Sequence, residues 1–170
     1  MILKTLKEKS SQKYINKLLA TRKVSVNNNK VDKIAVLLNA DEYDNFEAFR
    51  AYFKKLGRFN CKIIAFATHD KLESHKLEAY CNPNDFGWNG KIKNSHLESF
   101  CDAPFDVLIS YYKEETTQLS LITAASKANF KIGLSNKDER FYDLIIDINP
   151  NDLNVFKNEF EKYLNILNKL

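Results

Sequence analysis

Asn39 and Asp41 stand one residue apart, directly after the apolar run at residues 34–38. Two aspartates at this spacing after a buried strand would supply a nucleophile for phosphoryl transfer and an oxygen ligand for Mg²⁺. Asn39 takes the place of the nucleophile, however, and an amide cannot form an aspartyl phosphate. The pair therefore favours a binding role, unless Asp41 acts together with a residue from elsewhere in the chain.

Other residue types that could do chemistry are not spaced for it. The four glycines form neither a GxGxxG nor a GxxxxGK[ST] pattern, which excludes a P-loop and argues against a dinucleotide fingerprint. His69, Asp70 and His75 are suitable metal donors, but their spacing does not place two imidazole rings on one face of an element. We predict no metal and no cofactor.

The cysteines and the apolar runs indicate the compartment. Cys61, Cys81 and Cys101 are an odd number without a CxxC pair, which favours a reducing environment over a zinc site or a disulfide framework. The chain begins without the pattern of a signal peptide. No apolar run approaches the ~18 residues needed to cross a bilayer. We expect a cytoplasmic protein with no membrane span.

Continuous apolar runs alternate with helical patterns along most of the chain. Such runs are typical of strands that are covered on both faces, as in a parallel sheet. The runs lie at residues 34–38, 63–67, 107–109 and 144–146, with a weaker fifth at 130–134. They predict an α/β, three-layer Rossmann-like domain with a mainly parallel sheet of four or five strands. The short connection before residue 144 leaves an antiparallel last strand open, because a parallel crossover usually takes a dozen residues or more.

Two segments depart from this alternation. Residues 68–105 are irregular, although Asn89-Gly90 has the chemistry of a hairpin turn whose central positions need positive φ. Residues 1–29 form a basic amphipathic arm ahead of the α/β domain at residues 30–170: residues 1–30 hold eight Lys or Arg and a single acid, in a chain of net charge +4. The arm has one aromatic residue for base stacking, which argues against a nucleic-acid partner. Its leucines favour docking on its own domain or on a second copy, so a homo-oligomer is left open.

The candidate site follows from the predicted sheet. In open α/β sheets, ligands bind outside the carboxyl ends of the strands. The polar and aromatic residues at these ends are Asn39, Asp41, Ser110, Tyr111, Lys113, Ser135 and Asn136, and Trp88 from the irregular segment adds a lid or wall. They predict a non-catalytic module that binds a small ligand or a protein partner. The alternative is a small hydrolase or transferase at the same strand ends, using Asp41 with Lys113 or with a carboxylate such as Glu114 or Glu115.

Four segments carry a resemblance to a known family. They are NPNDFGWNGK at residues 82–91, PFDVLISYY at 104–112, LITAASKANFKIG at 121–133 and DLIID at 143–147. Together they resemble a domain-of-unknown-function family of Bacteroidetes-type bacteria, which implies no activity and no site residues. Residues 105–147 are also locally similar to the amino-terminal half of heptosyltransferase-like glycosyltransferases. Those enzymes bind their nucleotide sugar mainly in a second domain, so this similarity implies a transferase only together with a partner.

Overall fold

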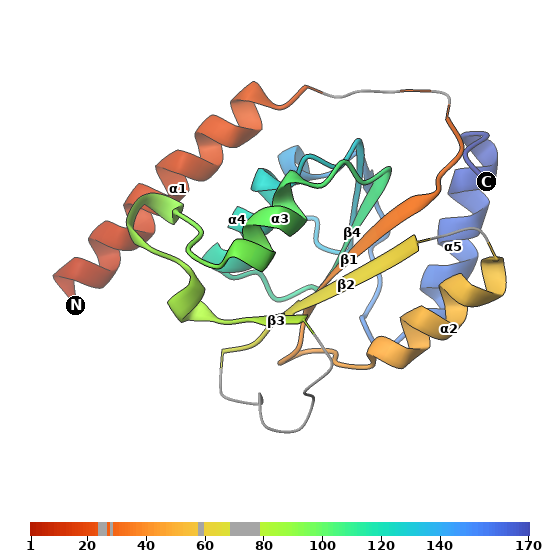
Figure 1. The fold of residues 1–170 in the computed structure, drawn as a ribbon, viewed down its shortest axis with the longest axis horizontal. Coiled ribbons are helices and arrows are strands. Elements are labelled where there is room, and N and C mark those ends of the chain that lie inside the picture. Colours follow the sequence, from red (N-terminus) through yellow and green to blue (C-terminus); the bar gives the residue numbers. More distant parts are fainter. Residues whose placement is uncertain (24–26, 28, 58–59, 69–78) are drawn as a thin grey trace.

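The computed structural model describes residues 1–23, 27, 29–57, 60–68 and 79–170. Within them, one sheet of six strands, all parallel, has the order β3-β2-β1-β4-β5-β6 (Figure 1). The strands are β1 (Lys33–Asn39), β2 (Asn60–Phe66), β3 (Ala79–Cys81), β4 (Val107–Tyr111), β5 (Phe130–Gly133) and β6 (Leu144–Ile145). The predicted α/β class and parallel sheet are therefore confirmed.

The strand count is higher than the four or five predicted. The unexpected strand is β3, which lies inside the segment expected to be irregular and pairs with β2 from Ala79 opposite Ile64. Three residues are too few to show a period in the sequence. The sequence left the direction of the last strand open, and the structure shows that β6 pairs with β5 in parallel. The crossover between these strands contains only the 3₁₀ helix η4 (Glu139–Phe141).

Helices cover both faces of the sheet, which explains the continuous apolar runs. α2 (Phe46–Leu56) and α5 (Leu153–Ile166) pack on one face, against Ile34, Val36 and Leu38 of β1. α3 (Ser95–Asp102) and α4 (Thr117–Ala125) lie on the other face, against Ala35 and Leu37. Side chains alternate between the two faces of a strand, so each face of β1 needs its own apolar set.

The predicted hairpin turn lies within the second of two short 3₁₀ helices. η2 (Pro83–Asp85) is followed by η3 (Trp88–Gly90), and Phe86 and Ile92 form an antiparallel bridge around η3. Asn89 and Gly90 have φ of 59° and 74°, as such a turn requires. A Cβ on Gly90 would lie 2.6 Å from Leu121 and 2.9 Å from a ring atom of Tyr14. The turn therefore packs closely against both α4 and the first helix.

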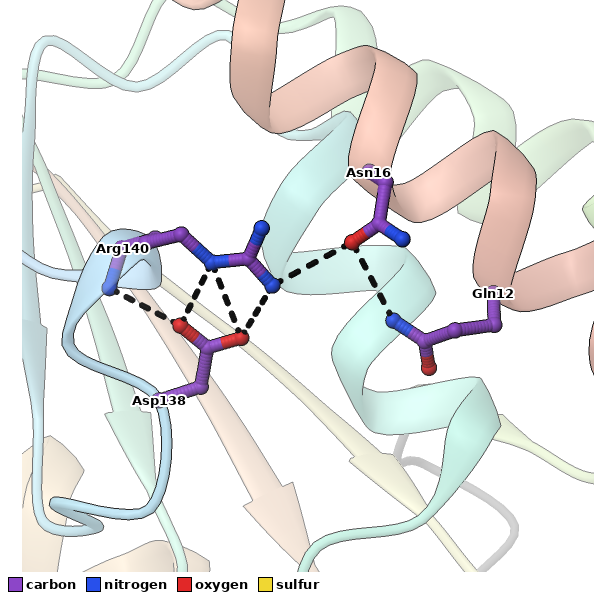
Figure 2. A network of polar contacts seen from close by, with 4 residues as sticks. All are labelled: Gln12, Asn16, Asp138 and Arg140. Carbon is purple, nitrogen blue, oxygen red and sulfur yellow. Dashed lines mark hydrogen bonds and ion pairs between the residues drawn. The ribbon is translucent and has the colours of Figure 1, made fainter.

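The basic arm forms helix α1 (Ile2–Thr21), which packs on α4 and η3. It buries Ser11 and Ile15 but leaves the apolar side chains of its first turns exposed. Polar contacts add to this docking. In Figure 2, the amide oxygen of Asn16 accepts hydrogen bonds from Arg140, at 3.2 Å, and from Gln12, at 3.5 Å. In the part of the chain that the structure describes, none of the helices combines the length and the apolar character that a bilayer span needs.

Candidate functional site

The strand order reverses between β1 and β4, and ligands in open α/β sheets bind at this position. Here the crevice is bridged by the chain's own side chains. The Glu42 carboxylate accepts hydrogen bonds from the backbone amides of Lys113, at 2.9 Å, and Glu114, at 3.2 Å. Asn39 Nδ2 donates to the carbonyl of Glu114 at 3.2 Å. The protein thus places its own carboxylate on the amides that could otherwise receive an anionic ligand.

Asp41 extends this arrangement to the end of β2. Its Oδ2 accepts hydrogen bonds from the backbone amide of Thr68, at 3.0 Å, and from the Thr68 hydroxyl. The Asn39 side chain, only 4% exposed, accepts from the Asp41 amide at 3.1 Å. Two predicted site residues therefore lie together and connect the loops after β1, β2 and β4.

A second group lies at the ends of β4, β5 and β6. Lys113 Nζ forms an ion pair with Asp147, and Asn136 Nδ2 donates to the same carboxylate at 2.9 Å. Ser135 is buried and its hydroxyl accepts from the Lys137 amide at 3.3 Å. Lys113 pairs with Asp147 and Asp41 with Thr68, so one of the pairs considered for the hydrolase alternative, Asp41 with Lys113, has separate partners.

The remaining predicted site residues lie apart from both groups. Ser110 and Tyr111 have no exposed surface: the Ser110 hydroxyl is 2.9 Å from that of Thr123, and the Tyr111 hydroxyl donates to the Pro150 carbonyl at 2.7 Å. Trp88 is 54% exposed on η3, beside α1. Binding of a ligand by the eight predicted residues stays a prediction, and they do not form one continuous surface.

A cavity of about 540 Å³ lies close to the first group, under the first half of α1. Its walls come from α1, from the end of β2, from residues 83–87 and from the start of α4. Phe66, Phe86 and Leu121 are its apolar lining. The polar and charged lining is Lys4, Lys7, Glu8, Ser11, Thr68, Glu115, Thr116, Thr117 and Gln118. Of these, sequence reasoning singled out Glu115 as a candidate for catalysis.

The start of α4 gives the cavity its polar wall. The Thr116 hydroxyl accepts from the Leu119 amide at 3.2 Å and so caps the helix. The first amides of a helix, here those of Thr117 and Gln118, have no acceptor within the helix and carry partial positive charge. Together with Lys4 and Lys7, they suit an acidic group. The one sequence signal for this wall is Glu-Thr-Thr before an apolar stripe, a pattern typical of a helix start.

Carboxylates also line the cavity, so its walls are mixed in charge. Glu8 and Glu115 face it along with the two lysines. Among the described residues, Glu115 Oε1 is buried without a hydrogen-bond partner. A buried acceptor without a donor is unfavourable by about 1–3 kcal/mol. These walls therefore favour a ligand that carries hydrogen-bond donors in addition to an acidic group.

A buried polar network lies on the same side of the sheet. Lys131 is 1% exposed, and its Nζ donates to the Thr123 carbonyl at 2.6 Å. Burial and the charge of Arg22 together lower the pKa of Lys131 to about 7, against the opposing effects of Asp143 and Cys101. Arg22, just after α1, forms an ion pair with Asp143. The lysine therefore sits at the end of α4 without access to a substrate.

The described residues offer little for nucleophilic or metal chemistry. Burial raises the pKa of Cys61 and of Cys101 to about 12, and it also raises the pKa of Cys81, so these thiols are poor nucleophiles near neutral pH. No group of three or more His, Cys, Asp or Glu in the described part of the chain could hold a metal ion. His69, Asp70 and His75 lie outside that part.

Comparison with known proteins gives a family without an activity. No curated protein and no solved structure matches the chain. A family model described as a family of unknown function, DUF6913, matches residues 7–167. The match includes most of α1 as well as the whole sheet, and it confirms the resemblance to a family of unknown function. The chain belongs to this family, DUF6913.

Proposed function

We propose that the protein is a non-catalytic module that binds a small acidic molecule in the cavity under α1. The observation that carries this proposal is the pairing of the first amides of α4 with Lys4 and Lys7 around one cavity. The cavity, at about 540 Å³, is within the range of small-molecule sites, about 300–1,000 Å³. An acidic group would lie at the start of α4, and the apolar remainder against Phe66, Phe86 and Leu121.

The arrangement of potential catalytic groups supports a binding role. Asp41 and Lys113 are held by different partners, Thr68 and Asp147. A general acid or base must reach the proton that it transfers. Neither Asp41 nor Lys113 lines the cavity, which is lined instead by hydroxyl groups, an amide side chain, two carboxylates and two lysines. Ligand binding is therefore the simpler reading of the site.

Isothermal titration calorimetry with inorganic phosphate tests the proposal. We expect affinity on the order of millimolar for so small a probe. Replacing both lysines, in Lys4→Gln/Lys7→Gln, should weaken binding about tenfold, because two charges next to the anion are lost. The matched control is Lys54→Gln/Lys55→Gln at the exposed end of α2, which should bind like the wild type. Equal affinity in all three proteins, or no binding by the wild type, would overturn the proposal.

A substrate screen separates binding from catalysis. The wild type should turn over neither phosphoesters nor glycosyl donors. Turnover that is abolished in Asp41→Ala would instead support a hydrolase or transferase at the strand ends. The likeness to glycosyltransferases, a Bacteroidetes-type bacterial origin and a cytoplasmic location stay predictions, the last supported by three free cysteines.

A further inference from the structure

α1 exposes apolar side chains on the side that faces away from the sheet. Ile2, Leu3 and Leu6 are 77%, 67% and 50% exposed, whereas Ile15 on the opposite side has no exposed surface. Scattered single apolar residues on a surface need no explanation, but three within five positions of one helix form a patch. The inward side of α1 is already used by the cavity and α4.

Three lysines lie farther along α1 on the same side as the apolar patch. Lys9, Lys13 and Lys17 are exposed and follow one another at four-residue spacing, which places them on the same side as Ile2 and Leu6. The single acid of α1, Glu8, lies at the cavity. We define the outer face of α1 as these three lysines together with Ile2, Leu3 and Leu6. It has an apolar tip and a positively charged remainder.

An exposed tryptophan lies next to this helix. Trp88 is 54% exposed, and the next residue, Asn89, is hydrogen-bonded to Ser10, one helical turn beyond Leu6. Figure 1 shows the segment with η3 running beside the first half of α1. Lys91 and Lys93 follow on the same segment and are exposed. Trp is the side chain that favours the boundary between water and lipid.

We infer that the outer face of α1 docks on an anionic phospholipid bilayer. Ile2, Leu3 and Leu6 would enter the headgroup region, with Trp88 at its boundary, and the lysines would contact lipid phosphates. The positive charge and the exposed aliphatic side chains occur together on one helix, and a bilayer complements both. Nucleic acid would complement only the charge, since the aliphatic side chains offer no stacking surface. This docking is independent of the cavity, which uses the opposite side of α1.

Vesicle co-sedimentation of the full chain tests the inference. The protein should bind vesicles of phosphatidylcholine and phosphatidylglycerol in equal parts, and not vesicles of phosphatidylcholine alone. Leu3→Ser/Leu6→Ser should lower partitioning at least about tenfold, because buried apolar surface is lost. The control is Ile166→Ser/Leu167→Ser at the end of α5, where both side chains are also exposed. It should partition like the wild type.

The electrostatic part is tested separately. Lys9→Gln/Lys13→Gln should lower partitioning about 30-fold, since each lysine near an anionic surface contributes about 1 kcal/mol. Lys54→Gln/Lys55→Gln should leave it unchanged. Failure of the wild type to bind anionic vesicles would overturn the inference. Loss of binding in the α5 control, or binding to RNA that exceeds binding to vesicles and does not depend on Leu3 and Leu6, would also overturn it. Phosphate binding in the cavity should persist in both α1 variants.

Discussion

The crevice between β1 and β4 and the cavity under α1 both lie at the carboxyl end of the sheet. They differ in whether the chain's own side chains occupy them. The crevice is bridged by Asn39 and Glu42, whose hydrogen bonds join the loops after β1 and β4. The cavity has open volume, and one wall of it is helix α1. The usual ligand position of this sheet is therefore filled by the chain itself, and an added helix creates a different one.

The two regions should also differ in how firmly they are held. The crevice lies between strands that are buried in the core on both faces. α1 is attached through few buried side chains, Ser11 and Ile15, and through polar contacts at its edges such as those of Figure 2. With so few buried contacts, detachment of α1 should require less free energy than opening of the core. Substitutions should therefore disturb the cavity without unfolding the sheet.

The largest expected effect is on the attachment of α1. Ile15→Ala removes a side chain with no exposed surface and should weaken docking by about 3 kcal/mol. Hydrogen exchange should then show lost protection in α1 while β1 and β4 keep theirs, and phosphate should no longer bind. Ile166→Ala, at an exposed position on α5, is the control. An equal loss of protection in β1 would show that α1 and the sheet open as one unit.

Asn39→Ala disturbs the crevice instead. It removes the acceptor of the Asp41 amide and the donor to the Glu114 carbonyl, and the free energy of unfolding should fall by about 2 kcal/mol. Urea unfolding measures this loss, and phosphate titration should give the wild-type affinity. A drop in phosphate affinity as large as that in Ile15→Ala would remove the distinction between the two regions.

The stability of the protein should depend on pH through Lys131, which is buried on the same side of the sheet as α1. With a pKa of about 7 in the folded chain and about 10.4 in the unfolded chain, Lys131 binds a proton only in the unfolded chain between these values. Its contribution should therefore raise stability with pH above about 7, by up to about 1.4 kcal/mol per unit, and should be flat below it.

Lys131→Met removes this contribution. Urea unfolding of both proteins between about pH 7 and about pH 8.5 should show the wild type gaining stability relative to the variant. Arg22, Asp143 and Cys101 are the charged or titratable groups that act on Lys131, and they are unchanged in the variant. A difference between the two proteins that stays constant over this range would contradict the lowered pKa.

The smallest expected effect on stability comes from the lysines of the cavity. Lys7 Nζ reaches the Phe86 carbonyl only at 3.4 Å, and Lys4 is exposed. Lys4→Gln/Lys7→Gln should change the free energy of unfolding by less than about 0.5 kcal/mol. Urea unfolding measures it. A loss of several kcal/mol would mean that the lysines hold α1 in place rather than serve a ligand.

Sequence reasoning reached the fold through its longest signals. The run at residues 34–38 is continuous because Ile34 and Ala35 pack on opposite, equally covered faces. β3 escaped prediction because Ala79–Cys81 contains none of the Val, Ile or Leu residues that mark the predicted runs. The direction of β6 was open because its crossover lacks a full helix. Local pattern therefore identifies a strand only where the strand carries an apolar run.

For the candidate site, the sequence indicated which residues follow the strands, but not which residues they contact in the fold. Asn39 and Asp41 were placed correctly at the end of β1, yet Glu42, which bridges the crevice, acts on amides 71 and 72 positions away. Lys4 and Lys7 meet the start of α4 only because α1 docks there. Such contacts between distant segments leave no spacing in the sequence from which they could be read.

An NMR titration with phosphate, in which the backbone amide chemical shifts are measured, tests most directly whether the ligand site lies under α1 rather than in the crevice. Thr117 and Gln118 line the cavity, whereas the amides of Lys113 and Glu114 donate hydrogen bonds to Glu42 in the crevice. We expect saturable shifts for the amides of Thr117 and Gln118 and none for those of Lys113 and Glu114. Shifts confined to Lys113 and Glu114, or no saturable shift at all, would show that phosphate does not bind under α1.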